Sequence, residues 1–432
     1  MRETKNARCA IAVLLGSLWI SACSDDASST GPSTAGSGGS VGGSGSGAGA
    51  TGGGGGTVEP CALGSTWTVV DDFVYSPGEP SNVGAIAAGP AGELYVSGVV
   101  RQGMFRALLR KSVDGGATWT TLEGVDPDSM QPVGGSGLVV DPAGVLFTVG
   151  VQGGQRVVWR SDDGGETFSR LDDAITIPTT IPCNTGAIAR EADGTLYTVA
   201  SCDDTGWLVR RGEDSGATWS TASTFQLATG KPARSGEVFV DAMGRPFTAG
   251  QAHDALDVNH WVVRGPDAQG NWATLDDYQL GQDAHAAAAS LGGRTRLFAV
   301  GAAATALPDF TGSHWIVRSQ DPTTRAWSTA DDFAPSMTAT SWAMAIYEDP
   351  AGALLVAGYV DETGTGANSA VARRSDDGGA SWRVVDTYSY QAGKPTAATH
   401  LASDPAGNVY MTVRGVDATD NPHWIVRKLA CD

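Results

Sequence analysis

The stretch Ser112-Val113-Asp114-Gly115-Gly116-Ala117-Thr118-Trp119 decides the fold, because its form returns along most of the chain. Each copy is a polar, glycine-rich turn followed by an aromatic residue. The aromatic residues at this place are Trp67, Trp119, Phe168, Trp219, Trp272, Trp327 and Trp382. Dividing residues 61–432 into seven units gives a period of about 53 residues, which suits a four-stranded propeller blade.

One unit next to this turn shows the strands. Residues 136–141, 145–151 and 157–160 are apolar runs of strand length. Residues 142–144 form a turn in which Gly144 is free to take a positive φ. The turn at 161–168 leads into a fourth strand. No long amphipathic helical period is present, so we predict an all-β chain.

The two ends of the repeat region complement each other. The last unit, residues 399–427, supplies three strands and has no fourth strand with a Trp. Residues 64–73, which contain Trp67, match that missing strand. We therefore predict a seven-bladed β-propeller over residues 61–432. It is closed by an N-terminal strand that completes the last blade and leaves no long exposed edge.

The first residues are typical of an exported protein. Basic residues in the first eight positions precede an apolar run over residues 10–19, which is too short to span a bilayer. The run ends in Ile20-Ser21-Ala22-Cys23, which resembles the lipobox of bacterial lipoproteins. The resemblance implies that residues 1–22 are a lipoprotein signal peptide, that cleavage precedes Cys23, and that Cys23 is lipidated. Several acyl chains together anchor a protein firmly.

The segment after the lipobox is a tether. Residues 24–60 are nearly all Gly, Ser, Ala and Thr and cannot form a core, so residues 23–60 are a lipidated Cys and a flexible linker. The reach of the linker is roughly 35 Å. In the lipoproteins that the sequence resembles, Ser24 after the Cys favours the outer membrane. We expect a lipid-anchored protein of the bacterial cell envelope, periplasmic or surface-exposed.

The composition excludes some classes of function. The chain has 28 Lys+Arg and 47 Asp+Glu, a formal net charge of −19. This balance argues against nucleic acid, because a phosphate backbone requires a basic face. Hydrophobic residues make up 41% of the chain, which excludes disorder throughout.

Four cysteines remain in the mature chain after the signal peptide is removed and Cys23 is lipidated. Cys61 precedes the closing strand and Cys431 follows the last one, so we expect a disulfide between them. Cys183 and Cys202 lie symmetrically about a hairpin turn and are cross-strand neighbours if that turn contains no bulge. Two disulfides fit an oxidising envelope compartment.

The repeated turn resembles the Asp-box, or BNR repeat, with the pattern S-x-D-x-G-x-T-W. The Asp residues of the four best copies are Asp114, Asp163, Asp214 and Asp377, and the copy at Asp214 lacks only the Ser. The Asp carboxylate can accept hydrogen bonds from its own turn, and the aromatic residue packs between blades. The resemblance implies that these Asp are structural and lie on the face opposite an active site.

Over residues 61–432 the chain resembles sialidase-like propellers. That superfamily includes sialidases, other glycoside hydrolases, and non-enzymatic binding or assembly factors. Sialidases carry an F/Y-R-I-P motif, and the nearest string here, Phe105-Arg106-Ala107-Leu108, lacks the Ile-Pro. The chain also has no convincing Tyr-Glu pair and seven units rather than the usual six. The resemblance to the catalytic motif therefore fails.

A glycosidase of another kind would need two carboxylates about 5 to 10 Å apart. Glu237 and His400 are the catalytic candidates, because they occupy a place in the innermost strand where most copies have Ala or Gly. The loops that would border a propeller cleft hold further titratable residues: His253, Asp254, Asp257, Asp309, Asp361, Glu362, Asp417 and Asp420.

Two other patterns repeat. The first, W-x-x-h-D-D-[FY], we interpret as an end-cap of the outer strand. Its Asp pairs are Asp71-Asp72, Asp172-Asp173, Asp276-Asp277 and Asp331-Asp332. The second consists of His260-Trp261, His314-Trp315 and His423-Trp424, followed by Arg264, Arg318 and Arg427. We interpret the Trp as packing against the next blade and the Arg as surface residues. No contiguous calcium loop is present, and we expect neither a metal nor a cofactor.

Two functions remain open. The first is a monomeric, non-catalytic binding or scaffold module that presents a propeller face to a protein or glycan partner. The alternative is a divergent glycoside hydrolase that acts on extracellular polysaccharide. Regular repeats and missing catalytic motifs favour the first, since a fold alone does not imply a function.

Overall fold

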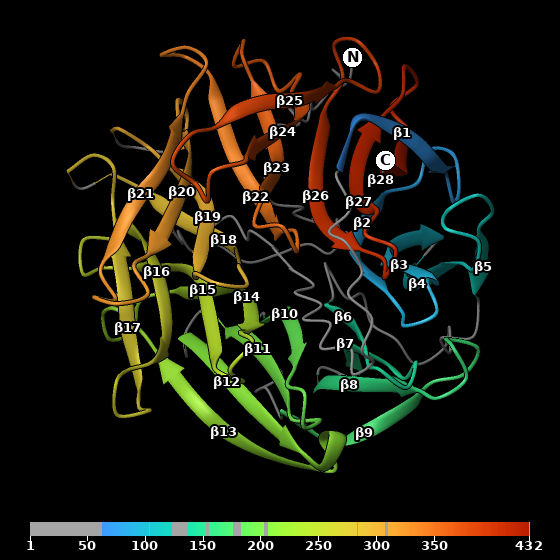
Figure 1. Cartoon of the computed structure of the whole chain (residues 1–432), viewed down its shortest axis with the longest axis horizontal. Helices are drawn as coiled ribbons and strands as arrows, with labels where there is room; N and C mark the ends of the chain where they lie inside the picture. Colours follow the sequence, from blue (N-terminus) through green and yellow to red (C-terminus); the bar gives the residue numbers. More distant parts are fainter. Residues whose placement is uncertain are drawn as a thin grey trace, which may run out of the picture.

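The computed structural model describes residues 63–431 except 103, 123–136, 153–154, 176–182, 203–205, 283 and 307–309. The predicted signal peptide and linker lie outside the described residues. The described residues form seven four-stranded antiparallel sheets, arranged as blades around a central axis (Figure 1). The predicted seven-bladed, all-β propeller is confirmed.

In each of blades 1 to 6, four consecutive strands run from the axis outward. Blades 1 to 3 are β2 (Ser81–Ala88), β3 (Leu94–Gln102), β4 (Met104–Ser112), β5 (Thr120–Leu122); β6 (Leu138–Val140), β7 (Leu146–Gln152), β8 (Gln155–Ser161), β9 (Ser169–Ile175); and β10 (Cys183–Arg190), β11 (Leu196–Cys202), β12 (Gly206–Glu213), β13 (Thr218–Phe225). Blades 4 to 6 are β14 (Ala233–Val240), β15 (Pro246–His253), β16 (Asn259–Pro266), β17 (Trp272–Tyr278); β18 (Ala286–Gly292), β19 (Phe298–Ala303), β20 (His314–Gln320), β21 (Trp327–Phe333); and β22 (Thr340–Glu348), β23 (Leu354–Asp361), β24 (Ser369–Ser375), β25 (Arg383–Tyr388).

Blade 7 joins the two ends of the chain. It consists of β26 (Thr396–Ser403), β27 (Val409–Val416), β28 (Pro422–Cys431) and, as its outer strand, β1 (Leu63–Phe73). In Figure 1 the blue β1 lies beside the red β28, and in the register Leu63 is opposite Cys431. The predicted closure is confirmed. The Cys61–Cys431 disulfide stays a prediction, because Cys61 lies outside the described residues.

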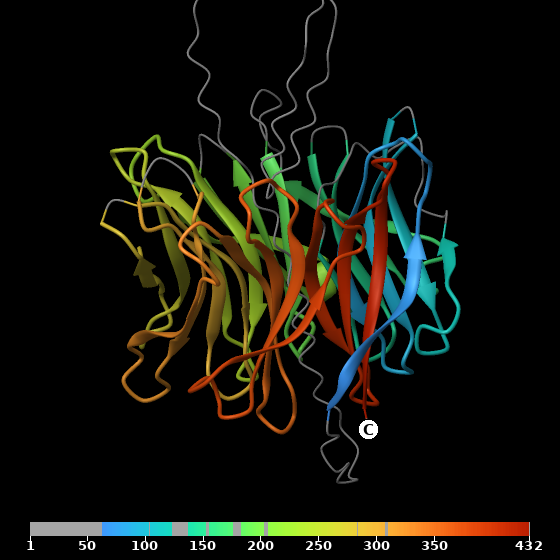
Figure 2. The ribbon, with the colours of Figure 1, turned by 90° about the horizontal axis from the view of Figure 1, so that it is seen from above.

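The propeller has two faces (Figure 2). We call upper the face that carries the loops between second and third strands and the connections between blades. The lower face carries the turns between first and second strands and between third and fourth strands. The turns that resemble the Asp-box, among them residues 112–119, therefore lie on the lower face.

Small residues in the inner strands and large ones farther out fill the space between blades. All seven residues of β18 are buried, and four of them are Ala. The Trp residues of the His-Trp pairs are also buried, and each lies against a glycine on the second strand of the next blade. A Cβ atom at that glycine would lie 2.6 Å from Trp424 at Gly98, 2.7 Å from Trp261 at Gly301 and 2.8 Å from Trp315 at Gly358. The predicted packing of these Trp residues is confirmed.

Cys183 and Cys202 are opposite each other in the register of β10 and β11. The condition set above, a hairpin without a bulge, is not met. The hairpin is centred on Asp193, and a bulge between Thr185 and Ile188 shifts the register by one residue. This shift brings the two cysteines opposite each other. Their side chains are not described, so the disulfide stays a prediction.

The part of the chain that the structure describes contains no helix long and apolar enough to cross a membrane.

Candidate functional site

Three of the turns that resemble the Asp-box share one set of hydrogen bonds. Asp114 Oδ1 accepts from the Thr118 amide at 2.8 Å, and Asp114 Oδ2 accepts from Thr118 Oγ1 at 2.6 Å. Ser112 Oγ donates to Asp114 Oδ1 at 2.8 Å. The same bonds surround Asp163 and Asp377. Hydrogen bonds from the Thr or Ser four residues later lower the pKa of all three carboxyls to about 2.

The fourth copy differs. Gly212 stands where the others have Ser, and Asp214 and Ser215 take left-handed φ values of 51° and 56° in the short 3-10 segment η1 (Asp214–Gly216). Among the described residues, the Asp214 carboxylate receives none of the hydrogen bonds of the other three turns.

The aromatic residue of the turn joins neighbouring blades. Trp119 Nε1 donates to the Val70 carbonyl oxygen on β1 at 3.0 Å, and the ring packs on the cluster that contains Tyr410 and Trp424. These contacts give the turn a role in blade packing.

The repeated Asp pairs and the Arg of the His-Trp repeat are partners. On β20, Arg318 donates to both carboxylate oxygens of Asp276 on β17 of the preceding blade, at 2.6 and 2.8 Å. Three other junctions have the same pairing: Asp71 with Arg110, Asp331 with Arg373 and Asp386 with Arg427. We call this contact the inter-blade clasp. The interpretation of the Asp pairs as end-caps of the outer strand is therefore wrong for the first Asp.

An aromatic ring completes each clasp. Tyr278, two residues after Asp276, lies 4.2 Å from the Arg318 guanidinium, within the range of cation–π contacts. The corresponding distances in the other clasps are 4.0 Å for Phe73 and Arg110, 3.9 Å for Phe333 and Arg373, and 4.2 Å for Tyr388 and Arg427.

The expected surface position of these Arg residues is wrong. Arg318 is 9% exposed and Arg427 is 5% exposed. Trp and Arg are three residues apart, so they point to opposite sides of the strand. The Trp side packs on the next blade and the Arg side on the preceding one, and neither side of a blade faces solvent here. Burial raises the pKa of Asp276, and the hydrogen bonds from Arg318 oppose that rise.

In three blades the second Asp of the pair contacts the His of its own blade. The distance from His Nδ1 to the carboxylate is 2.7 Å for His260 and Asp277, 2.5 Å for His314 and Asp332, and 2.6 Å for His423 and Asp72. Blade 6 lacks both partners, with Ser369 and Thr387 at these places. Within the described residues, no group of three or more His, Cys, Asp or Glu is arranged to hold a metal ion.

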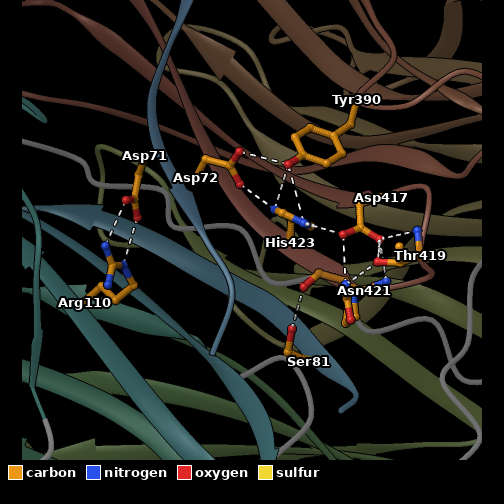
Figure 3. Close-up of polar contacts among 10 residues, drawn as sticks. Asp71, Asp72, Ser81, Arg110, Tyr390, Asp417, Thr419, Asn421 and His423 are labelled. Atoms are coloured by element: carbon orange, nitrogen blue, oxygen red, sulfur yellow. Dashed lines mark hydrogen bonds and ion pairs between the residues drawn. The ribbon is translucent and has the colours of Figure 1, made fainter. Parts of the chain in front are cut away.

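Blade 7 adds a phenol to this arrangement on the upper face (Figure 3). His423 lies between Asp72, at 2.6 Å, and Asp417, at 3.5 Å. Tyr390, from the connection between blades 6 and 7, donates its hydroxyl to Asp72 at 2.9 Å and lies 2.8 Å from His423 Nδ1. Burial raises the pKa of Tyr390, and its hydrogen bond to Asp72 acts in the same direction.

Blade 4 repeats most of this cluster. His260 lies between Asp277, at 2.7 Å, and Asp254, at 3.7 Å. Aligning the Gly-Lys-Pro segments 230–232 and 393–395 puts Leu227 at the place of Tyr390. Recurrence in a second blade indicates that the His and its carboxylates have a structural role. Sequence reasoning missed Tyr390, which this alignment of the connections would have marked as a departure from the repeat.

The catalytic candidates Glu237 and His400 lie at equivalent places in β14 and β26, each directly after a bulge. Glu237 is fully buried, and its Oε2 accepts from the Leu291 amide of blade 5 at 3.3 Å. His400 is 3% exposed, lies 3.4 Å from Thr412 Oγ1, and has its pKa lowered to about 3 by burial. The two residues lie on blades that are not neighbours. A substrate could reach either only if the blades separated.

The candidate acids of the upper loops are engaged locally. Asp254, Asp361 and Asp417 accept hydrogen bonds from amides of their own loops. Asp257 pairs with Lys231 at 2.6 Å, and Asp420 pairs with Lys394 at 2.5 Å. Asp309 and the side chains of Asp172 and Asp173 lie outside the described part of the chain.

No family model and no curated protein matches the chain. Among solved structures, YCF48 from Cyanidioschyzon merolae is 14% identical with a TM-score of 0.50, over 85% of this chain and 98% of that one. An ulvan lyase of a polysaccharide lyase family is 9% identical with a TM-score of 0.53, over 85% and 93%. The Hadza microbial sialidase Hz136 is 15% identical with a TM-score of 0.42, over 80% and 64%. The likeness to sialidases and other propeller proteins is one of fold alone.

Proposed function

We propose that this chain is a lipid-anchored β-propeller of the bacterial envelope that binds a glycan without cleaving it. The anchor is Cys23 and the linker is residues 24–60, as the lipobox resemblance implies. The turns at Asp114, Asp163 and Asp377 are Asp-boxes in this proposal, and disulfides join Cys61 to Cys431 and Cys183 to Cys202.

One observation carries the non-catalytic part of the proposal. The charged and titratable side chains that recur along the chain form hydrogen bonds and ion pairs with one another. The clasp between Arg318 and Asp276 and the pair of His260 and Asp277 are examples. The two candidates that depart from the repeat, Glu237 and His400, are 0% and 3% exposed. A catalytic group must touch its substrate, so these placements support binding rather than hydrolysis.

The choice of a glycan over a protein rests on the fold. The ulvan lyase named above acts on a polysaccharide by its name, and propellers of this fold serve many functions. A glycan is therefore the first class of ligand to test.

The test uses the full-length chain on a broad panel of polysaccharides, with binding measured by retention and cleavage by mass spectrometry of the products. We expect retention of at least one member and no products. Retention of none, in a sample with the circular dichroism of a folded β protein, would contradict glycan binding. Cleavage that is lost in Glu237→Gln would establish the alternative, a divergent glycoside hydrolase.

A further inference from the structure

The lower face of blade 5 departs from the repeat. In four other blades the turn between the first two strands begins with an Asp whose carboxylate accepts the amide at the fifth position of the turn. These residues are Asp141, Asp241, Asp349 and Asp404. Blade 5 has Gly293-Arg294-Thr295-Arg296 at this place, two basic residues and no acid.

Blade 6 supplies the carboxylate that this turn lacks. Glu348, buried at the end of β22, accepts from the Arg294 amide at 2.5 Å and from Thr295 Oγ1 at 3.1 Å. Gly293 has a φ of 121°, and a Cβ atom there would lie 1.8 Å from the Arg296 carbonyl oxygen. The backbone of the turn is therefore fixed from the neighbouring blade, while the side chains of Arg294 and Arg296 are exposed.

A pocket of about 270 Å³ opens beside this turn, between blades 4 and 5. Four arginines line it, Arg245, Arg294, Arg296 and Arg325, with a single acid, Asp241. Since the whole chain has 28 basic and 47 acidic residues, this is a local reversal of its charge. A concave surface of one sign focuses the field and attracts ions of the opposite sign.

Two of the four guanidinium groups, those of Arg294 and Arg296, are exposed, and the charge of Arg296 also acts on Asp321. Arg245 pairs with Asp241 at 2.6 Å, and Arg325 donates to the Pro266 carbonyl at 2.8 Å. Over the described residues, Arg294 and Arg296 form no ion pair. Glu348 and Asp349 line an adjoining pocket together with these two arginines. Their carboxylates, and that of Asp321 in the next turn of blade 5, accept hydrogen bonds from turn amides.

We propose that the pocket between blades 4 and 5 binds a carboxylate or sulfate group of an anionic polysaccharide, which rests on the glycan binding proposed above. A guanidinium offers two parallel N–H donors that match the oxygens of either group. The acidic remainder of the surface repels a polyanion, so this pocket is where such a chain docks.

The experiment measures the affinity of the full-length chain for polygalacturonate, dextran sulfate and neutral dextran. We expect binding to one or both charged polymers that weakens as salt is added. The double variant Arg294→Gln/Arg296→Gln should lower that affinity by at least about tenfold, since each lost charged hydrogen bond is worth more than a factor of ten in binding. The polymer that binds tighter identifies the group.

The matched control is Arg101→Gln/Arg383→Gln, which removes two exposed arginines elsewhere and makes the same change in net charge. We expect it to bind as the unaltered chain does. Equal affinity for charged and neutral polymers, or equal losses in the two double variants, would overturn the anion pocket and leave glycan binding intact. Retention of no polysaccharide at all would overturn both. Equal thermal midpoints for the two variants show that each is folded.

Discussion

Blades 4 and 5 are joined by a clasp that blades 3 and 4 lack. At the first junction, Arg318 meets Asp276 and lies 4.2 Å from the ring of Tyr278. At the second, Arg264 lies 4.2 Å from the ring of Phe225, but Ser223 stands at the place where Asp276 stands in blade 4. Burial lowers the pKa of Arg264, and no carboxylate opposes that effect.

Because Arg318 has its partner and Arg264 does not, the repeated residues are best understood as partners across blades rather than as single features. Blade 6 lacks the second Asp and the His together, with Thr387 and Ser369 in their places. Blade 3 has Ser223 at the place of the first Asp, whereas blade 4 has Arg264 at the place of its partner.

The largest effect is expected from breaking the complete clasp with Asp276→Ala. The side chains of Arg318 and Asp276 are 11% and 5% exposed, so the substitution leaves a buried guanidinium without its counter-ion. We expect the free energy of unfolding in urea to fall by about 3–5 kcal/mol. The control is Ser223→Ala at the incomplete junction, which should change it by less than about 0.5 kcal/mol. Similar losses of unfolding free energy in both variants would show that the clasp does not stabilise the fold.

A smaller effect of opposite sign is expected from completing the other junction with Ser223→Asp. The new carboxylate would meet Arg264, whose charge burial now disfavours. We expect a gain of about 1.5 kcal/mol in the free energy of unfolding, the lower end of what one charged hydrogen bond contributes. The gain should vanish in the Arg264→Met background, as a double-mutant cycle would show. A loss of stability in Ser223→Asp alone would show that the junction does not accept a carboxylate.

The fold could be predicted because its signals are local. The turn of residues 112–119 and the strands around it repeat with one period. Trp67 identifies residues 64–73 as the outer strand that the last unit lacks. The clasp could not be predicted in this way. Arg318 and Asp276 are 42 residues apart on different blades, and alternation along a strand says only that Arg and Trp point to opposite sides. That both sides are buried follows from the packing of the ring.

The candidate site was less accessible to sequence reasoning. Glu237 and His400 were found as departures from a row of small residues, but their burial depends on the blades on either side. Arg294 and Arg296 belong to no sequence motif. They become candidates only through the contact of their turn with Glu348 on another blade and through the pocket beside them. Tyr390 lies in a connection between blades, outside the strands whose repeat the sequence shows.

The smallest change in stability is expected at acid pH. It comes from comparing the turn at Asp377, which has the full set of Asp hydrogen bonds, with the turn at Asp214, which lacks them. The pKa of Asp377 is lowered from its ordinary value of 3.8 to about 2 by hydrogen bonds from Ser381 and its amide. A carboxyl with a depressed folded pKa stabilises the fold above its unfolded value and loses that contribution as pH falls through the folded value. Asp377→Asn should therefore be less stable than the unaltered chain above pH 4, and the difference should shrink as pH falls toward about 2. Asp214→Asn, at the turn without these hydrogen bonds, is the matched control in urea melts across the same range. If the difference in the free energy of unfolding between Asp377→Asn and the unaltered chain were the same at every pH, the hydrogen bonds of Asp377 would not depend on its charge. The turn would then be stabilised by its shape alone.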